Sequence, residues 1–174
     1  MKKRIIVFIG VLAMVMLAAC SGSQSPVKDG VFTTTADEFK SKFETVISSD
    51  ERFSSLEVQG SSKDKDEYIY IAVAYNGEVV GIAQFYKDGK SAIFGHMASY
   101  SSSFELSDVE TFLTACCMAL DSSLTYDDAY QMIENFMSST SGTSISKNGV
   151  QYTCGLQDSV FLIAAQPDEN TDDN

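Results

Sequence analysis

The chain has 174 residues, with 12 lysines and arginines against 24 aspartates and glutamates, and its net charge at pH 7 is −12. Nucleic acids and anionic lipid surfaces attract basic proteins, so this charge argues against nucleic acid as a partner and gives no attraction to anionic lipid. The length suits one domain, and no internal repeat or low-complexity block divides it.

The first twenty residues have the pattern of a secretory leader. A basic start at residues 2–4 precedes an apolar run over residues 5–19. A helix that crosses a bilayer needs about 20 apolar residues, so this run is shorter than a membrane span. The sequence Leu17-Ala18-Ala19-Cys20 resembles the lipobox of bacterial lipoproteins, in which a diacylglyceryl group is joined to the cysteine sulfur and signal peptidase II cuts just before it.

This resemblance covers only residues 1–20. It implies a signal peptide over residues 1–19, lipidation of Cys20, and a protein anchored by its lipid to the extracytoplasmic face of a cell membrane. An ordinary signal peptide that holds a cysteine, or an uncleaved anchor, is the alternative.

Cleavage before Cys20 would leave 9 basic and 24 acidic residues, a net charge of −15. Residues 20–30 are rich in serine and glycine and predict a flexible stalk that carries the lipidated cysteine. Residues 31–166 predict a single globular domain, and the acidic residues 167–174 predict a disordered tail.

Three helices are predicted from their first turns. Thr35, Ser107 and Thr125 each stand three residues before a carboxylate, a pattern that caps the backbone N–H groups of a helix start. Apolar residues follow each of them at helical spacing. The short connection at residues 121–124 predicts that the second and third helices form a hairpin.

Strands are predicted at residues 56–59, 68–75, 78–86, 91–99, 149–156 and 159–165. Asn76-Gly77 and Asp88-Gly89 favour tight turns, so the strands that they join are antiparallel. The fold class is therefore α+β: a two-layer sandwich of three helices on an antiparallel sheet of about five to six strands, in the order α-β-β-β-β-α-α-β-β. This order resembles the helix-on-sheet folds of small bacterial inhibitor and surface lipoprotein domains, although a fold alone does not give a function.

The two turns also predict which side chains share a face of the sheet. Two-residue loops pair Val73 with Val80 in the first hairpin and Phe85 with Ala92 in the second. This register places aliphatic side chains under the helices, and aromatic and small ones on the opposite face. The residues expected at the centre of that opposite face are Tyr68, Tyr70, Phe85, Phe94 and His96.

Such a face suits contact with a protein or cell-wall partner, or with a second copy in a homodimer. The alternative is that the first helix or a terminal segment covers the face, because large bare apolar patches are uncommon on monomers.

The sequence holds no convergent set of catalytic residues. His96 is the single histidine, so metal sites built on two imidazoles are excluded, and a structural role for it is favoured over that of a general base. No phosphate loop, HExxH, GxSxG or EF-hand pattern occurs. We therefore expect no cofactor, no metal and a non-enzymatic interaction domain; an envelope enzyme that uses His96 is the alternative.

Three cysteines remain besides Cys20. Cys116 and Cys117 lie on the second predicted helix, and Cys154 lies on a predicted strand. A disulfide from Cys116 or Cys117 to Cys154 would close a loop of about 38 residues and stabilise the fold by roughly 4 kcal/mol. The alternative is three buried thiols that pack as small apolar side chains.

Overall fold

The structure is a computed structural model that describes residues 25–65, 67–97, 104–139, 141–157 and 160–168. The expected signal peptide, Cys20 and residues 169–174 of the expected tail lie outside these ranges. In chain order the described elements are β1 (Val27–Lys28), β2 (Val31–Phe32), α2 (Ala36–Ser49), η1 (Glu51–Phe53), β3 (Leu56–Lys63), β4 (Tyr68–Tyr75), β5 (Glu78–Tyr86), β6 (Ala92–Met97), α3 (Leu106–Leu120), α4 (Tyr126–Met137), β7 (Ser144–Lys147), β8 (Val150–Gln157) and β9 (Val160–Pro167).

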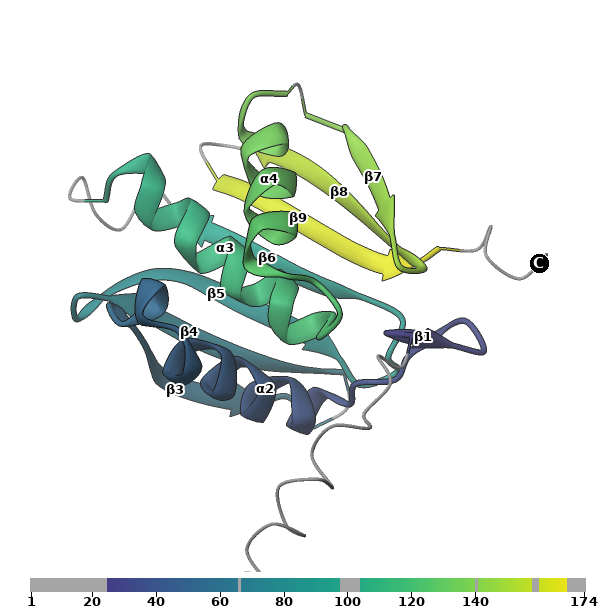
Figure 1. Cartoon of the computed structure of the whole chain (residues 1–174). Coiled ribbons are helices and arrows are strands. Elements are labelled where there is room, and N and C mark those ends of the chain that lie inside the picture. Colours follow the sequence, from purple (N-terminus) through teal and green to yellow (C-terminus); the bar gives the residue numbers. More distant parts are fainter. Residues whose placement is uncertain (1–24, 66, 98–103, 140, 158–159, 169–174) are drawn as a thin grey trace, which may run out of the picture.

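The described elements form two layers. Seven strands make one antiparallel sheet in the order β3-β4-β5-β6-β9-β8-β7, and α2, α3 and α4 lie on the same face of it (Figure 1). Helix α2 packs over β3 to β5, and α3 packs over β4 to β6. The predicted α+β class is confirmed, with helices on an antiparallel sheet.

The sheet has one strand more than the upper predicted number, and a second small sheet precedes it. Strand β7 is short and polar, and it turns into β8 at Asn148 and Gly149, whose φ angles are 55° and 81°. Strands β1 and β2 form a hairpin through Asp29 and Gly30, with φ angles of 53° and 70°. Both turns carry the Asn-Gly or Asp-Gly signal, but β1, β2 and β7 have only two to four residues, which is too short to show a clear alternation.

The folded part extends beyond the predicted range of 31–166 at both ends. The β1–β2 hairpin lies within the expected stalk and is tied to the β5–β6 turn, because the Phe32 N–H donates to the Gly89 carbonyl at 2.7 Å. At the other end β9 runs to Pro167, and the Asp168 N–H donates to the Gly149 carbonyl at 2.8 Å. Residues 27–30 and 167, which the prediction assigned to the stalk and the tail, thus lie in described strands and their turn.

Two of the three predicted helix caps are confirmed. Thr35 and Thr125 each cap their helix in a reciprocal capping box. The prediction of Ser107 as a cap is wrong, because α3 begins at Leu106 after Glu105. The Asp108 carboxylate accepts from the Glu105 N–H at 2.9 Å, so the carboxylate one residue after Ser107 sets the start of the helix.

A β-bulge in β5 overturns the predicted division of faces. Tyr75 pairs with Glu78 as expected, but Val73 pairs with Gly81 instead of Val80, because Val80 has no partner on β4. One extra residue reverses the side on which every later side chain of the strand lies. The predicted pairing of Phe85 with Ala92 is confirmed. The side chains of β6 therefore lie on the face opposite to the predicted one, like those of β5 after the bulge.

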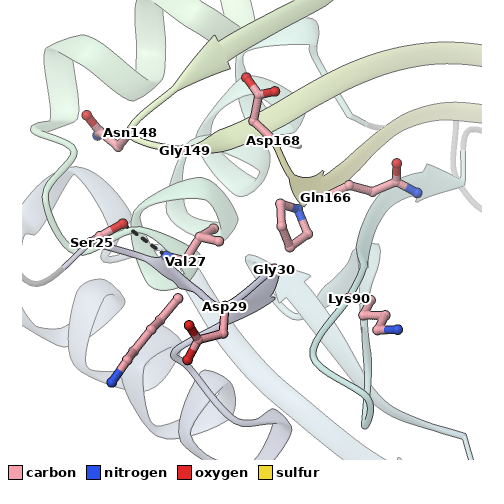
Figure 2. A pocket seen from close by; sticks show the side chains of 11 residues that line it. Ser25, Val27, Asp29, Gly30, Lys90, Asn148, Gly149, Gln166 and Asp168 are labelled. Carbon is pink, nitrogen blue, oxygen red and sulfur yellow. Dashed lines mark hydrogen bonds between the residues drawn. The ribbon is translucent and has the colours of Figure 1, made fainter. Parts of the chain in front are cut away.

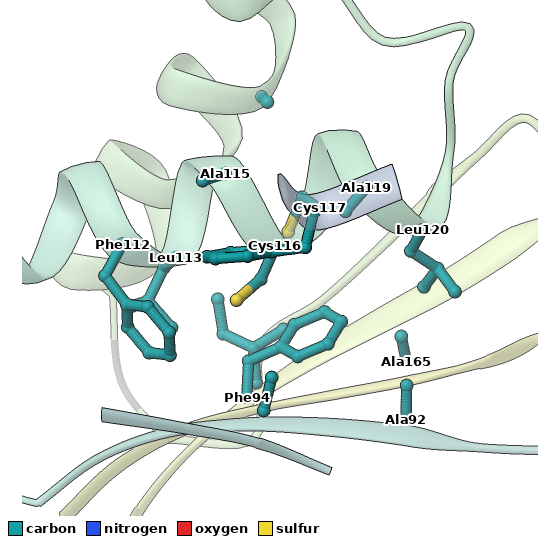
Figure 3. Close-up of a cluster of buried hydrophobic side chains, with 14 of the residues drawn as sticks. Ala92, Phe94, Phe112, Leu113, Ala115, Cys116, Cys117, Ala119, Leu120 and Ala165 are labelled. Carbon is teal, nitrogen blue, oxygen red and sulfur yellow. The ribbon is translucent and has the colours of Figure 1, made fainter. Parts of the chain in front are cut away.

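Two of the rings expected on the outer face consequently lie in the core. Phe85 and Phe94 are 1% and 0% exposed, and Phe39 of α2 stacks on both with centroid distances of 5.5 and 5.7 Å. Figure 3 shows Phe94 beneath α3, with Cys116 and Phe112 directed toward the sheet. These aromatic contacts between the layers form the centre of the fold.

Gly81 allows α3 to lie directly on the bulged strand. A Cβ atom at this position would be 2.4 Å from Cε1 of Phe112 and 2.6 Å from the carbonyl oxygen of Gly95. The Phe112 ring or the backbone would have to move to make room for this atom. The bulge and the position of the Phe112 ring therefore both depend on a residue without a side chain.

Gly81→Ala is therefore expected to lower the free energy of unfolding by about 1–3 kcal/mol, as overpacking does in a tight core. The matched control is Gly60→Ala on edge strand β3, where an added Cβ has no atom within 4 Å. Urea unfolding followed by circular dichroism measures both. Equal unfolding midpoints would show that Phe112 does not need the space at Gly81.

Candidate functional site

The structure divides the five residues predicted for the binding face between the two sides of the sheet. Tyr68 and Tyr70 are half-buried and alternate with core residues of β4, so they face away from the helices as predicted. The prediction is wrong for Phe85 and Phe94, which the bulge turns into the core. His96 also lies on the helix side, where it is half-buried and lines a cavity.

A different set of residues shares the outer face with the two tyrosines. They are half-buried and uncharged, and they alternate with the core residues of their strands. They are Ala72 on β4, Ile82, Gln84 and Tyr86 on β5, Ile93 on β6, Gln151 and Thr153 on β8, and Leu162 and Ala164 on β9. Together with Tyr68 and Tyr70 we call this set the open sheet face, because no described helix lies on it (Figure 1).

The tyrosines form one end of the open sheet face. The Tyr68 ring meets Tyr70 and Tyr86 edge to face, with centroid distances of 4.4 and 6.0 Å. A hydrogen bond with the Tyr70 hydroxyl, and then the charge of Tyr70, burial and the carboxylates of Asp64 and Glu67, raise the pKa of Tyr68 to about 12. At neutral pH the Tyr68 side chain therefore keeps its phenolic proton.

A recess of about 500 Å³ lies between this cluster and edge strand β3. Its lining combines an aromatic ring, two small or aliphatic side chains and a glycine-serine stretch of the edge strand. The residues are Gly60, Ser61, Ser62, Tyr70, Ala72 and Ile82. The recess offers apolar contact beside hydroxyl groups, which suits a side chain of a binding partner.

His96 is held by the bulge. Its Nδ1 atom lies 2.6 Å from the carbonyl oxygen of Val80, the residue that has no partner on β4. Because a carbonyl only accepts, Nδ1 must donate, and Nε2 is then the acceptor of the neutral ring. The ring edge also meets Phe104 at a centroid distance of 6.1 Å. These contacts give His96 a structural function.

Two further side chains with titratable groups line the cavity beside His96. The same cavity is lined by Cys154 and Glu105, and the remaining lining is mainly apolar. Within the described ranges no group of three or more His, Cys, Asp or Glu residues could hold a metal ion.

A polar recess of about 610 Å³ lies at the sheet end that carries the β1–β2 hairpin (Figure 2). Its charged side chains are Lys28 and Lys90 together with Asp29 and Asp168. They come from the β1–β2 hairpin, the β5–β6 turn and the end of β9. Because charges of both signs line it, the recess has no preference for an anion or a cation.

The cysteines are held as thiols, so the predicted disulfide is not formed in the structure. Cys116, Cys117 and Cys154 are 0%, 0% and 2% exposed. Cys116 faces Phe94 of β6, and β9 separates β6 from the strand of Cys154. For Cys116, two strand spacings are roughly 10 Å, which exceeds the reach of a disulfide. Cys117 lies near Tyr152 of β8, and it too is a free thiol. Burial raises the pKa of the Cys116 and Cys117 thiols, which keeps them protonated.

Comparison of the chain with protein-family models, with curated proteins and with solved structures found no match. Among the described helices none is both long and apolar enough to span a membrane. The function is therefore inferred from the geometry of the chain's own residues.

Alkylation with iodoacetamide in denaturant, without reductant, is expected to modify Cys116, Cys117 and Cys154 completely. In the native protein Cys116 and Cys117 should react at least tenfold more slowly than in denaturant, because they are buried and protonated. Peptide mass spectrometry measures the modification of each site. A cysteine that reacts only after reduction would establish a disulfide instead.

Proposed function

We propose that this protein is a membrane-anchored extracytoplasmic lipoprotein whose domain binds another protein through the open sheet face, and that it is not an enzyme. The single observation that carries the proposal is the uncharged, half-buried surface formed by β4, β5, β6, β8 and β9 on the side without helices.

The chemistry of this face supports contact with a protein. The exposed side of an antiparallel sheet usually carries polar and charged residues, whereas the middle of this one carries Ile82, Ile93 and Leu162. Contiguous apolar surface of this kind marks interaction sites, and tyrosine is enriched in protein interfaces. The cluster of Tyr68, Tyr70 and Tyr86 supplies the amphipathic rings.

Charge favours a partner of different composition over a second copy. The exposed Glu57 lies on edge strand β3, next to the open sheet face. Asp64 and Glu67 lie beside Tyr68. A face-to-face homodimer would bring these carboxylates toward those of the other copy, in a chain with a net charge of −12. The loop between β3 and β4 also carries Lys65, and Lys87 donates to its backbone, so the partner that fits has an apolar centre and a rim of both charges with a basic excess.

The expected anchor would keep this surface near the bilayer. Four residues separate Cys20 from Ser25, and the five residue steps between these positions span at most about 18 Å when the chain is extended. Two or more acyl chains hold a protein firmly, because each buried methylene contributes about 0.8 kcal/mol. A partner in the same membrane, or at its surface, is therefore within reach of the open sheet face.

Cys20→Ser is expected to abolish lipidation, because the lipid has no other attachment site. The variant should then be found in the soluble fraction or remain as the uncleaved precursor. Fractionation and intact-mass analysis measure the location and the added acyl mass. Ser21→Ala is the matched control and should leave both unchanged. Retention of Cys20→Ser in washed membranes at the mature mass would contradict the lipid anchor.

A photo-crosslinking residue in place of Gln84, at the centre of the open sheet face, is expected to give one discrete adduct in intact membranes. The same residue in place of Ser48, on the exposed side of α2, should give none. Adding Ile93→Lys to the Gln84 probe should reduce the adduct at least tenfold, because a buried unpaired charge opposes docking. The thermal midpoint of each variant verifies that it is folded.

Two outcomes of the crosslinking would contradict the proposal. Equal amounts of adduct from positions 84 and 48 would show that the partner does not bind the open sheet face in preference to the rest of the surface. An adduct of twice the chain mass would identify a homodimer and refute the charge argument.

A further inference from the structure

We propose a second binding site: the cavity beside His96 binds a small, neutral, apolar molecule that donates one hydrogen bond to the imidazole ring. This site lies on the helix side of the sheet, and it depends on no part of the function proposed for the open sheet face.

The cavity has the size and lining of a small-molecule site. Its volume is about 400 Å³, and such sites commonly measure roughly 300–1,000 Å³ with mostly apolar walls and few polar groups. The start of α3, the end of α4 and strands β6, β8 and β9 enclose it. Its apolar walls are Phe104, Leu106, Val109, Met137 and Phe161.

The exposure of the walls distinguishes an inner end from a rim. Val109 and Cys154 are 4% and 2% exposed, so the inner end is formed by side chains shielded from solvent. Leu106 at the rim is 62% exposed, the highest value among the large apolar side chains of the described residues. A leucine left in water beside an apolar cavity would be covered if a ligand filled the cavity.

His96 defines the polar chemistry of the ligand. Its Nδ1 is committed to the Val80 carbonyl, so Nε2 is the hydrogen-bond acceptor of the neutral ring. The other polar side chains of the lining, Glu105, Ser139 and Ser141, are exposed at the rim. No lysine or arginine is among the described residues that line the cavity, so none of them offers a fixed positive charge to an anion.

The first test compares two probes, of which one can donate a hydrogen bond. 4-Propylphenol carries a hydroxyl group, whereas 4-propylanisole keeps the oxygen but has a methyl group in place of the donated hydrogen, which makes it one methylene larger. Calorimetric titration of the full chain in mild detergent should give about tenfold tighter binding of the phenol. The absence of saturable binding of either probe would overturn the site, and equal affinities would overturn the donor assignment.

His96→Asn separates the role of His96 in ligand binding from its structural role. The asparagine amide can still donate to the Val80 carbonyl, whereas the Nε2 acceptor is lost. The variant should bind the phenol about tenfold more weakly and the anisole with unchanged affinity. Loss of both affinities at an unchanged thermal midpoint would show that His96 only shapes the walls.

Two further variants locate the site without altering His96. Leu106→Lys at the rim should weaken binding of the phenol at least tenfold. Val79→Lys removes the other exposed large apolar side chain, which is outside the cavity lining, and should bind like the parent protein. Saturating phenol should also slow iodoacetamide modification of Cys154 severalfold and leave that of Cys116 unchanged. Equal affinities of the two lysine variants, or no protection of Cys154, would place the ligand elsewhere.

Discussion

The fold depends on how the bulge of β5 is held in place. The bulge leaves Val80 without a partner residue on β4, and the Nδ1 atom of His96 donates to the Val80 carbonyl at 2.6 Å. The next residue, Gly81, leaves room for the ring of Phe112, so α3 packs on the strand at the point where the register shifts. A histidine, a glycine and a phenylalanine from three separate elements thus hold the irregularity in place.

This local arrangement determines the character of both sheet faces. It sends Phe85 and Phe94 to Phe39 of α2, which gives the helical layer a stacked aromatic core. The same shift brings Ile82 and Ile93 to the side without a described helix. The packing of the core and the exposure of the aliphatic surface therefore have a common cause, and a change that removed the bulge would alter both.

The features that the sequence predicts correctly are local ones. The caps at Thr35 and Thr125 and the turn at Asn76-Gly77 involve residues within a few positions of one another. The bulge is different, because it depends on a ring about thirty positions further along the chain. Its one sequence signal is Gln84, a polar side chain that the uninterrupted register would bury beneath the helices. The cysteine pairing also depended on strand order, which no local pattern reveals.

The last strand of the chain lies in the interior of the sheet. Strand β9 pairs with β6 on one side and β8 on the other, so it joins the half made by β3 to β6 to the half made by β7 and β8. Until residues 160–167 are available, β6 presents an unsatisfied backbone edge and the two halves share no strand pairing. The sheet is therefore completed only when β9 pairs with β6 and β8, which makes these contacts between residues far apart in the sequence a late requirement of folding.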